Sequence, residues 1–314
     1  MPIEKDGTPY GAVVIPTRNR PADVRSCLAC LLADRPRATI VVIDASDEDE
    51  TENLCRELGQ TSLDILYRRA KAPSLARQRN EGVDLCRELG VEVIHFLDDD
   101  TEVKPGYLDA IEARIADDPA LAGVGAIIEN QPKVPVKILK RVFALWGPHP
   151  GSILRSGCGV NGQFPSVTRN RHDPEWLCGC AMSYRMTVFE RHRFDERMQG
   201  YSLGEDIDFG FRVSRTHRLA VESSARCFHQ FSSKNRLTRE KYGHMRTVVT
   251  YCWVREHRSD GMSLLAFWWS VLGDLLLHAA DGIVVRRRGG GQYAKGIIRG
   301  IATIAAGRAT RSAE

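Results

Sequence analysis

One stretch of the chain restricts its fold more than any other: residues 91–100, which read VEVIHFLDDD. Its apolar half is short and contains several β-branched residues, as buried strands do. Three adjacent carboxylates at the strand end repel one another, and they cost stability unless a cation lies among them. Ligands of α/β proteins bind at the carboxyl ends of the strands. The stretch therefore predicts an α/β sheet with a cation-dependent site at its edge. An acidic turn in contact with water is the alternative.

The carboxylates Asp98, Asp99 and Asp100 are hard oxygen donors, which suit Mg²⁺ or Mn²⁺. Magnesium sites usually take one or two carboxylates and leave the remaining positions to water and substrate phosphates. His229 ends a predicted strand at 221–229, and a neutral imidazole also binds divalent metals. Its position alone does not distinguish a metal ligand from an ordinary core or surface histidine, so both interpretations stay open.

Short apolar runs alternate with helical patterns along most of the chain. Strands are expected at residues 12–15, 39–43, 63–67, 91–97, 121–128 and 221–229, and helices at 21–32, around 54–58, at 75–90, from 105, around 186–193 and at 204–212. This order predicts a mostly parallel sheet covered by helices on both faces. Neither the glycine fingerprint of dinucleotide-binding proteins nor a P-loop follows the first strand. Residues 130–173 are rich in Gly and Pro and predict a long irregular insertion.

Composition is typical of a soluble globular protein and gives no support for nucleic acid as a partner. Of the 314 residues, 43% are hydrophobic and 27% are charged, and the net charge of +4 is small. The first eleven residues are polar, unlike a secretory signal, so we expect the nine cysteines to be reduced in the cytoplasm. Cys27 and Cys30 form a C-x-x-C pair inside a predicted helix, among leucines, which favours core packing over redox chemistry.

A second acidic pair, Glu205 and Asp206, lies far along the chain from the first. A metal-assisted transfer also needs a base, and a carboxylate that deprotonates an incoming hydroxyl contributes roughly 10²–10⁴-fold in rate. The pair also begins a helical pattern, where carboxylates simply favour the positive end of the helix dipole. Both interpretations fit the pair on its own.

Six segments, in the same order, resemble motifs of the family 2 glycosyltransferases. They are residues 13–20 (VVIPTRNR), 42–46 (VIDAS), 76–82 (ARQRNEG), 96–100 (FLDDD), 179–182 (GCAM) and 204–208 (GEDID). One such motif has little specificity, whereas six in order are specific, and the resemblance extends from about residue 11 to residue 229. It implies a GT-A fold, which is Rossmann-like α/β with a mostly parallel sheet, together with a nucleotide-diphosphate sugar as donor and Mn²⁺ or Mg²⁺ as cofactor.

The same resemblance assigns roles to individual residues. It implies a nucleotide-sugar pocket formed by Pro16, Thr17, Arg18, Arg20, Asp44, Arg79, Asn80, Asp98 and Asp99. It implies the metal ligands Asp98, Asp100 and His229, and an acceptor side with Trp176, Gly179 and Cys180. Core packing is an equal alternative for Trp176. Ala45 follows Asp44 where many members carry a second acidic residue, so the nucleotide base stays undetermined.

The implied reaction is a single displacement with inversion at the anomeric carbon. Asp206, with Glu205 beside it, would accept the proton of the attacking hydroxyl while the metal stabilises the departing diphosphate. The acceptor would be a glycan or a lipid-linked molecule.

The sequence changes character after His229, and we expect two parts. A catalytic domain is predicted at residues 1–233, and a helical, basic and apolar C-terminal region at 234–314. Residues 262–285 of that region are apolar and as long as a membrane-spanning helix.

Three polar residues interrupt this segment at helical spacing: Asp274, His278 and Asp281. Charges at bilayer depth are costly, so the pattern favours an amphipathic helix at the membrane interface, or packed on the catalytic domain, over a span. Arg286–Arg288 would suit anionic lipid head groups. We therefore hypothesise a peripheral enzyme at the inner face of the cell membrane, with a helical lid or an oligomer contact as the alternative.

Two other functions compete with a glycosyltransferase. A magnesium-dependent phosphohydrolase of the haloacid dehalogenase kind also uses strand-end aspartates, but its D-x-D-x-[TV] motif stands early in the chain. Counted from Asp98, the fifth position here is Glu102, where that motif has Thr or Val. A catalytically silent nucleotide-sugar binding module would need no base, whereas this chain retains Glu205 and Asp206.

Overall fold

One large sheet organises the chain. In the computed structural model, which describes residues 4–5, 8–35, 38–60, 64–132, 138–165, 171–232, 234, 236–283 and 289–312, this sheet has nine strands. They are β3 (Gly11–Thr17), β4 (Thr39–Asp44), β5 (Asp64–Arg69), β6 (Val93–Leu97), β7 (Thr101–Val103), β8 (Leu121–Ile128), β9 (Arg171–His172), β10 (Ala181–Arg185) and β11 (Arg218–His229). Strands β1 (Glu4–Lys5) and β2 (Thr8–Pro9) pair with each other.

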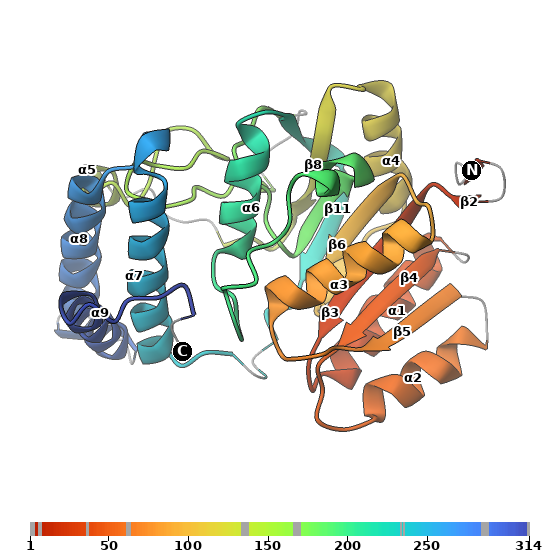
Figure 1. Cartoon of the computed structure of the whole chain (residues 1–314), viewed down its shortest axis with the longest axis horizontal. Coiled ribbons are helices and arrows are strands. Elements are labelled where there is room, and N and C mark those ends of the chain that lie inside the picture. The colour runs from red at the N-terminus through yellow and green to blue at the C-terminus, as the bar shows by residue number, and fades with distance from the viewer. Residues whose placement is uncertain are drawn as a thin grey trace.

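Helices cover both faces of the large sheet and form a separate stack at one end of the molecule (Figure 1). They are α1 (Pro21–Asp34), α2 (Glu50–Gly59), α3 (Leu75–Glu88), α4 (Tyr107–Asp117), α5 (Ile138–Val142), α6 (Glu205–Ser214), α7 (Arg239–Glu256), α8 (Leu264–Ile283) and α9 (Gly290–Ala305), with the 3₁₀ helices η1 (Met186–Glu190) and η2 (Arg258–Asp260). The stack at the end consists of α7, α8 and α9.

Strand β3 shows how the sheet is covered on both faces. Its side chains alternate, because successive residues of a strand point to opposite faces. Val13 and Ile15 belong to the apolar cluster with α1, α2 and α4. Ala12 and Val14 belong to the cluster with α3, η1 and α6. The uninterrupted burial of β3 is therefore that of a central strand between two layers of helices.

The sheet is parallel in its first half and mixed in its second. The order is β5-β4-β3-β6-β10-β8-β11-β7, with β9 on β11, and the pairings among β5, β4, β3 and β6 are all parallel, as predicted. Strand β10 runs antiparallel to both β6 and β8. The chain enters β10 from the irregular segment rather than through a helical crossover, so nothing in the connection requires a parallel strand.

Local sequence signals explain the helix boundaries that matter for the site. Ser74 caps α3, and its Oγ accepts a hydrogen bond from the backbone N–H of Arg77, as the sequence predicts. The helix predicted around 186–193 is the short 3₁₀ helix η1 instead. The insertion at 130–173 is irregular apart from α5 and β9 in its described residues.

The C-terminal helices share a core with the rest of the chain. Trp253 of α7, Phe267 of α8 and Ile297 of α9 lie in one apolar cluster with Trp176 and with Phe211 of α6. Across the described ranges, no helix combines the length and the hydrophobicity that crossing a bilayer requires. Residues 264–283 of the predicted apolar segment form α8. The three arginines at 286–288, on which the membrane hypothesis partly depends, lie outside the described residues, as does the side chain of Asp281.

Candidate active site

Three prospective metal ligands converge where β6 ends. Asp98 and Asp100 follow β6, and His229 is the last residue of β11, which pairs with β7 so that His229 lies opposite Thr101. His229 Nε2 lies 2.9 Å from Oδ1 of Asp100 and 4.0 Å from Oδ2 of Asp98. One ligand atom from each of the three residues lies within 4.8 Å of the others. Two carboxylates and an imidazole at this spacing could hold a divalent metal ion.

Asp100 is held ionised by its neighbours. Burial raises the pKa of its carboxyl, but hydrogen bonds from His229 and from the backbone N–H of Ser232, at 2.8 Å, outweigh burial and lower that pKa below its usual value. Arg236 Nη2 lies 3.4 Å from the same carboxylate. A metal ligand has to be deprotonated, so this environment suits the role that the sequence predicts.

Asp99 makes different contacts. Thr17 Oγ1 donates a 2.7 Å hydrogen bond to its Oδ2, and Arg20 Nη1 donates a 3.0 Å hydrogen bond to its Oδ1. Burial raises the pKa of Asp99 to about 7. Asp99 therefore ties the loop after β3 to the acidic triplet rather than adding a third carboxylate to the metal ligands.

These residues lie together in a cleft of about 560 Å³. Its lining includes the predicted Pro16, Thr17, Arg18, Arg20, Asp98, Asp99, Asp100 and His229. We call it the donor cleft. It is also lined by Arg236, Tyr201 and Lys241, which none of the sequence motifs contains. Arg236 and Lys241 come from the C-terminal region, so that region contributes part of the cleft's wall.

Arg79 joins the donor cleft to the second acidic pair. The side chain is 1% exposed, and its Nη2 donates hydrogen bonds to Oδ1 of Asp98, at 3.1 Å, and to the carbonyl of Gly179, at 2.9 Å. Its Nη1 donates to the carboxylate of Glu205. A side chain at Gly179 would collide with this guanidinium, because an added Cβ would lie 2.9 Å from both of its terminal nitrogens. Arg79 lies between the two acidic groups and is not among the residues that line the donor cleft.

Asp206 occupies the first turn of α6, which Gly204 begins with a positive φ of 82°. Its Oδ2 accepts the N–H of Gly179 and its Oδ1 accepts the N–H of Ile207, both at 2.9 Å. Burial raises the pKa of Asp206 above its usual value, although these two bonds oppose the rise. Burial likewise raises the pKa of the neighbouring Glu205, against the opposing effect of Arg79.

A second cavity, of about 310 Å³, opens over Asp206. We call it the acceptor-side cavity, and its lining includes Trp176, Cys178, Tyr242, Arg246 and Trp253. Trp176, which is predicted either for the acceptor side or for core packing, is 8% exposed and also belongs to the apolar cluster shared with α6 and α7. Cys180 is 2% exposed and packs in the main core, so the thiol beside the cavity is that of Cys178. Both cysteines precede β10, and their sulfur atoms lie 3.7 Å apart.

Two residues predicted to contact the nucleotide are engaged elsewhere. Asp44 is 0% exposed, and its carboxylate accepts hydrogen bonds from the N–H of Ser46 and, at 3.0 Å, from the hydroxyl of Tyr67. Asn80 is 2% exposed and exchanges hydrogen bonds with the backbone of Phe194. Both are absent from the donor cleft's lining. Periodicity places such residues on a helix or a strand end but does not say what their polar atoms bond to.

Gln78, within the same motif, has a positioning role that the sequence analysis did not assign. Its Nε2 donates to the carbonyls of Thr17 and Ile43, at 2.9 and 2.8 Å, and so ties the ends of β3 and β4 together beneath the cleft. No local pattern in the sequence identifies these two bonds, because both carbonyls belong to strands far from Gln78 along the chain.

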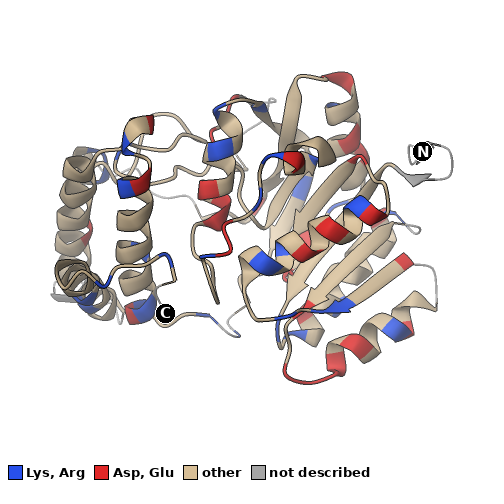
Figure 2. Cartoon of the chain, viewed as in Figure 1, with Lys and Arg blue, Asp and Glu red and all other residues tan. Residues whose placement is uncertain are grey.

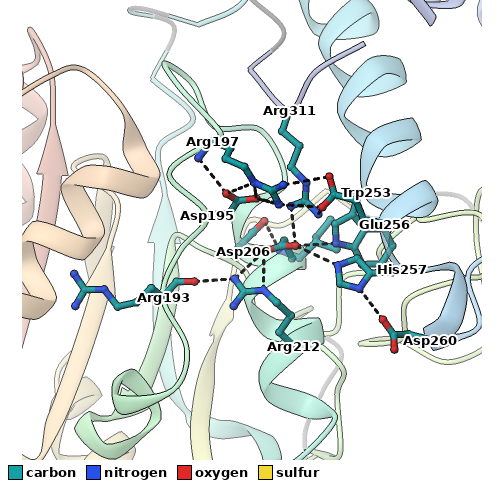
Figure 3. A network of polar contacts seen from close by, with 12 residues as sticks. Arg193, Asp195, Arg197, Asp206, Arg212, Trp253, Glu256, His257, Asp260 and Arg311 are labelled. Atoms are coloured by element: carbon teal, nitrogen blue, oxygen red, sulfur yellow. Dashed lines mark hydrogen bonds and ion pairs between the residues drawn. The ribbon is translucent and has the colours of Figure 1, made fainter. Parts of the chain in front are cut away.

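The start of α6 is fixed from the far side by Asp208. Its Oδ2 accepts two hydrogen bonds from Arg212, at 2.9 and 2.7 Å. Its Oδ1 accepts Nε1 of Trp253, at 3.0 Å, and Nη1 of Arg311, at 2.9 Å. Figure 3 shows Arg212, Trp253 and Arg311 gathered near the first turn of α6, together with Asp206.

Arg311 brings the end of the chain into this network. It is 6% exposed, and besides Asp208 it contacts Asp195, at 2.8 Å, and Glu256 of α7, at 2.7 Å (Figure 3). One side chain from the C-terminal tail therefore links α6, α7 and the loop before α6.

A comparison of sequences identifies the family. The model of glycosyl transferase family 2 matches residues 12–192, more than half of the chain. The chain belongs to glycosyl transferase family 2. It is therefore a glycosyltransferase, and neither the phosphohydrolase nor the silent binding module applies. The matched segment includes the Asp98–Asp100 triplet, whereas Asp206, His229 and the C-terminal helices lie beyond it. No curated protein matches the chain.

Solved glycosyltransferases share the fold, which confirms the predicted GT-A class. The mannosyltransferase PcManGT from Pyrobaculum calidifontis, in complex with GDP-Man and Mn²⁺, is 15% identical with a TM-score of 0.55, over 95% of this chain and 76% of that one. TarS 1-349 of S. aureus is 14% identical with a TM-score of 0.51, over 95% and 83%. GalNAc-T7, solved with UDP, GalNAc and Mn²⁺, is 15% identical with a TM-score of 0.55, over 94% and 56%. At such low identities the likeness extends to the fold alone.

Proposed function

We propose that this glycosyltransferase moves a sugar from a nucleotide-diphosphate donor to an acceptor hydroxyl with inversion, using Asp206 as the base. The observation that carries the proposal is the pair of adjacent sites joined by Arg79. One holds the Asp98, Asp100 and His229 cluster in the donor cleft, and the other holds Asp206 in a cavity of its own. A displacement from the face opposite the leaving group needs this separation between the diphosphate and the base.

The donor cleft fits a nucleoside diphosphate and a divalent cation. Asp98, Asp100 and His229 would hold Mn²⁺ or Mg²⁺, which when bound stabilises the negative charge of the departing diphosphate. Among the cations that line the cleft, Arg20 and Arg236 lie beside Asp100 and would bind phosphate oxygens. Two of the related structures were solved with Mn²⁺ and a nucleotide or nucleotide sugar, which supports this donor class.

Asp206 has the properties of a general base. Its pKa is raised by burial, so it binds a proton more readily than an exposed aspartate does, and general bases work best with a pKa close to the operating pH. The N–H groups of Gly179 and Ile207 fix the orientation of its carboxylate. Glu205 cannot replace it at the same position, because Arg79 already engages Glu205.

The acceptor would bind in the cavity above Asp206. Aromatic rings of Trp176, Tyr242 and Trp253 line it, and such rings stack on sugar or other apolar faces. We propose that the acceptor is a glycan or a lipid-linked molecule. With a lipid-linked acceptor, the enzyme would work at the inner face of the cell membrane. The apolar C-terminal region supports the membrane location.

A thermal-shift panel tests the donor site. Nucleoside diphosphates of different bases are added with and without Mn²⁺ or Mg²⁺, since a ligand that binds the native state raises the melting temperature. We expect a shift that requires both the metal and one nucleotide and that is lost in Asp100→Ala. The absence of a shift with any nucleotide would contradict the donor assignment.

Asp206→Asn tests the base separately. We expect transfer to fall by roughly 10²–10⁴-fold while the metal-dependent nucleotide shift persists, because the substitution leaves the donor cleft intact. Asp195→Asn, which changes a carboxylate of the network on the other side of α6, serves as the control and should retain much more activity. Unchanged transfer by Asp206→Asn would exclude Asp206 as the base.

A further inference from the structure

Helix α8 carries its polar residues inward and a row of large apolar residues outward. Asp274 is 7% exposed, where it pairs with Arg246 of α7 and accepts a 3.2 Å hydrogen bond from the hydroxyl of Tyr293 of α9. The ring of His278 stacks on that of Tyr293, with centroids 4.1 Å apart. The two described residues of the predicted polar face, Asp274 and His278, are therefore satisfied inside the helical stack, and the opposite face is left to the outside.

The outward face is a continuous stripe. Leu265, Trp269, Leu272 and Leu276 recur at i, i+4, i+7 and i+11, with exposed fractions of 83%, 45%, 44% and 51%, and Trp268 lies beside them. The complementary positions, such as Phe267 and Val271, are buried. In Figure 1, α8 lies at the end of the molecule remote from the sheet, and in Figure 2 it is almost entirely free of charged residues.

Helix α5 extends this stripe. Trp269 Nε1 donates a 2.7 Å hydrogen bond to the carbonyl of Val142, and Phe143 packs so closely on α8 that a Cβ at Gly273 would lie 2.1 Å from its ring. These contacts place α5 against α8, and we group the exposed apolar residues of the two helices as the α8–α5 surface: Ile138, Leu139, Val142, Leu265, Trp268, Trp269, Leu272 and Leu276.

The charges around this surface indicate what covers it. Lys140 and Arg141 lie within α5, between its apolar residues, and Arg155 is exposed beside the start of α8, where its carbonyl accepts the N–H of Ser263. The acidic residue of α8 nearest the stripe, Asp274, is turned inward and paired. Apolar side chains with two tryptophans and flanking cations are the features of a surface that enters the head-group region of an anionic bilayer.

We propose that the α8–α5 surface docks on an anionic lipid membrane. The proposal builds on the proposed function, because it supplies the acceptor-side cavity with a membrane-bound substrate. Leu145, three residues after the end of α5, lines that cavity together with Asp206. A lipid-linked acceptor held in the membrane beneath α5 and α8 would thus have its head group near the proposed base.

Flotation of the full chain with vesicles tests the docking surface. Vesicles of phosphatidylcholine alone are compared with vesicles that contain phosphatidylglycerol. We expect the wild type to float with the anionic vesicles and less with the neutral ones. Leu265→Glu and Leu272→Glu should each weaken binding on the order of tenfold, since each removes a leucine from the buried contact.

The chain offers a matched control. Leu66 of β5 is 37% exposed on the sheet side of the molecule, so Leu66→Glu makes the same chemical change at a similar exposure to Leu272 and should float as the wild type does. Lys140→Ser with Arg141→Ser should remove the preference for anionic vesicles. Each variant is also checked by its melting temperature and by the metal-dependent nucleotide shift, which reports the donor cleft independently of the membrane.

Three results would overturn the proposal. The first is that the wild type does not float with anionic vesicles. The second is that Leu272→Glu floats as well as Leu66→Glu. Alternatively, sedimentation would show a dimer that Leu272→Glu converts to a monomer, in which case a second copy of the chain covers the surface. A protein that does not float but keeps the metal-dependent nucleotide shift would contradict only the membrane proposal. A protein that floats but shows no nucleotide shift would contradict only the assignment of the donor cleft.

Discussion

Arg79 is the residue through which the two acidic groups of the site act on each other. It is almost completely buried, and its guanidinium lies between Asp98 of the donor cleft and Glu205 beside the proposed base. Without this cation, carboxylates from both groups would face one another at low solvent exposure, where like charges repel strongly. The metal cluster and the base can lie this close because Arg79 separates them.

Arg79→Met should therefore destabilise the protein by about 3 kcal/mol, since removing one partner of a buried ion pair leaves the other charge uncompensated. Urea unfolding measures the change in the free energy of unfolding. Arg56→Met is the control, because the Arg56–Glu52 pair is exposed and should contribute less than about 1 kcal/mol. Equal effects of the two substitutions would show that Arg79 has no such role.

The protonation of Asp206 gives a second prediction for single residues. A base must be ionised to accept a proton, and burial raises the pKa of Asp206. The rate of transfer should therefore fall as the pH drops through that raised pKa, which is higher than the ordinary value of an aspartate. Rates are measured with saturating donor and metal, and the nucleotide shift at each pH separates loss of the base from loss of donor binding. A transfer rate that does not change as the pH is lowered would contradict the assignment of Asp206 as the base.

At the scale of elements, helix α6 carries the proposed base on one side of its first turn and a structural carboxylate on the other. Asp206 lines the acceptor-side cavity, while Asp208 accepts hydrogen bonds from Arg212, Trp253 and Arg311. The helix dipole favours carboxylates in this turn. The proposed base and the structural carboxylate are thus different residues of the same turn.

His257, just after α7, contributes to the same anchor and makes it depend on pH. Burial alone would lower the pKa of His257, but hydrogen bonds to Asp208 and Asp260 raise it above the ordinary value. A raised histidine pKa means that the folded state binds the proton more tightly than the unfolded state does. The stabilisation is therefore complete below about pH 6.5 and is lost as the pH rises through the raised pKa. The wild type should exceed His257→Gln in free energy of unfolding at pH 6 by more than at pH 9. A difference that does not change with pH would contradict this.

The sequence predicts the helices and strands whose apolar residues recur at a regular spacing. It does not predict features that depend on contacts between segments far apart in the chain. The strands β3, β4 and β6, the capped start of α3 and the Asp98–Asp100 triplet follow from local patterns. The direction of β10 does not, because it depends on how an irregular insertion returns to the sheet. The roles of Asn80, Gln78 and Arg79 do not either, since each bonds to residues far along the chain that periodicity cannot identify.

At the scale of the whole molecule, the C-terminal region completes both cavities. Arg236 and Lys241 line the donor cleft, and Tyr242 and Trp253 line the acceptor-side cavity. In Figure 1, the α7–α9 stack and the sheet lie on opposite sides of α6. The sequence predicts a boundary at residue 233, and the shared contacts lead us to propose instead that the two parts fold as one unit.

A chain that consists of residues 1–233 tests this directly. It lacks Trp253 and Arg311, so Phe211 of α6 would lose apolar cover and Asp208 would lose two of its hydrogen-bond donors. An exposed apolar core and an incompletely paired buried carboxylate are both costly, so we expect this chain to be largely insoluble or to melt without a cooperative transition. A chain of residues 1–307 is the matched control. It retains α7, α8 and α9 but lacks Arg311, and it should fold with a lowered melting temperature, because Arg311 pairs with three carboxylates. If residues 1–233 instead unfolded cooperatively and retained the metal-dependent nucleotide shift, the catalytic part would be an independent domain, and the C-terminal helices would be the separate appendage that the sequence predicts.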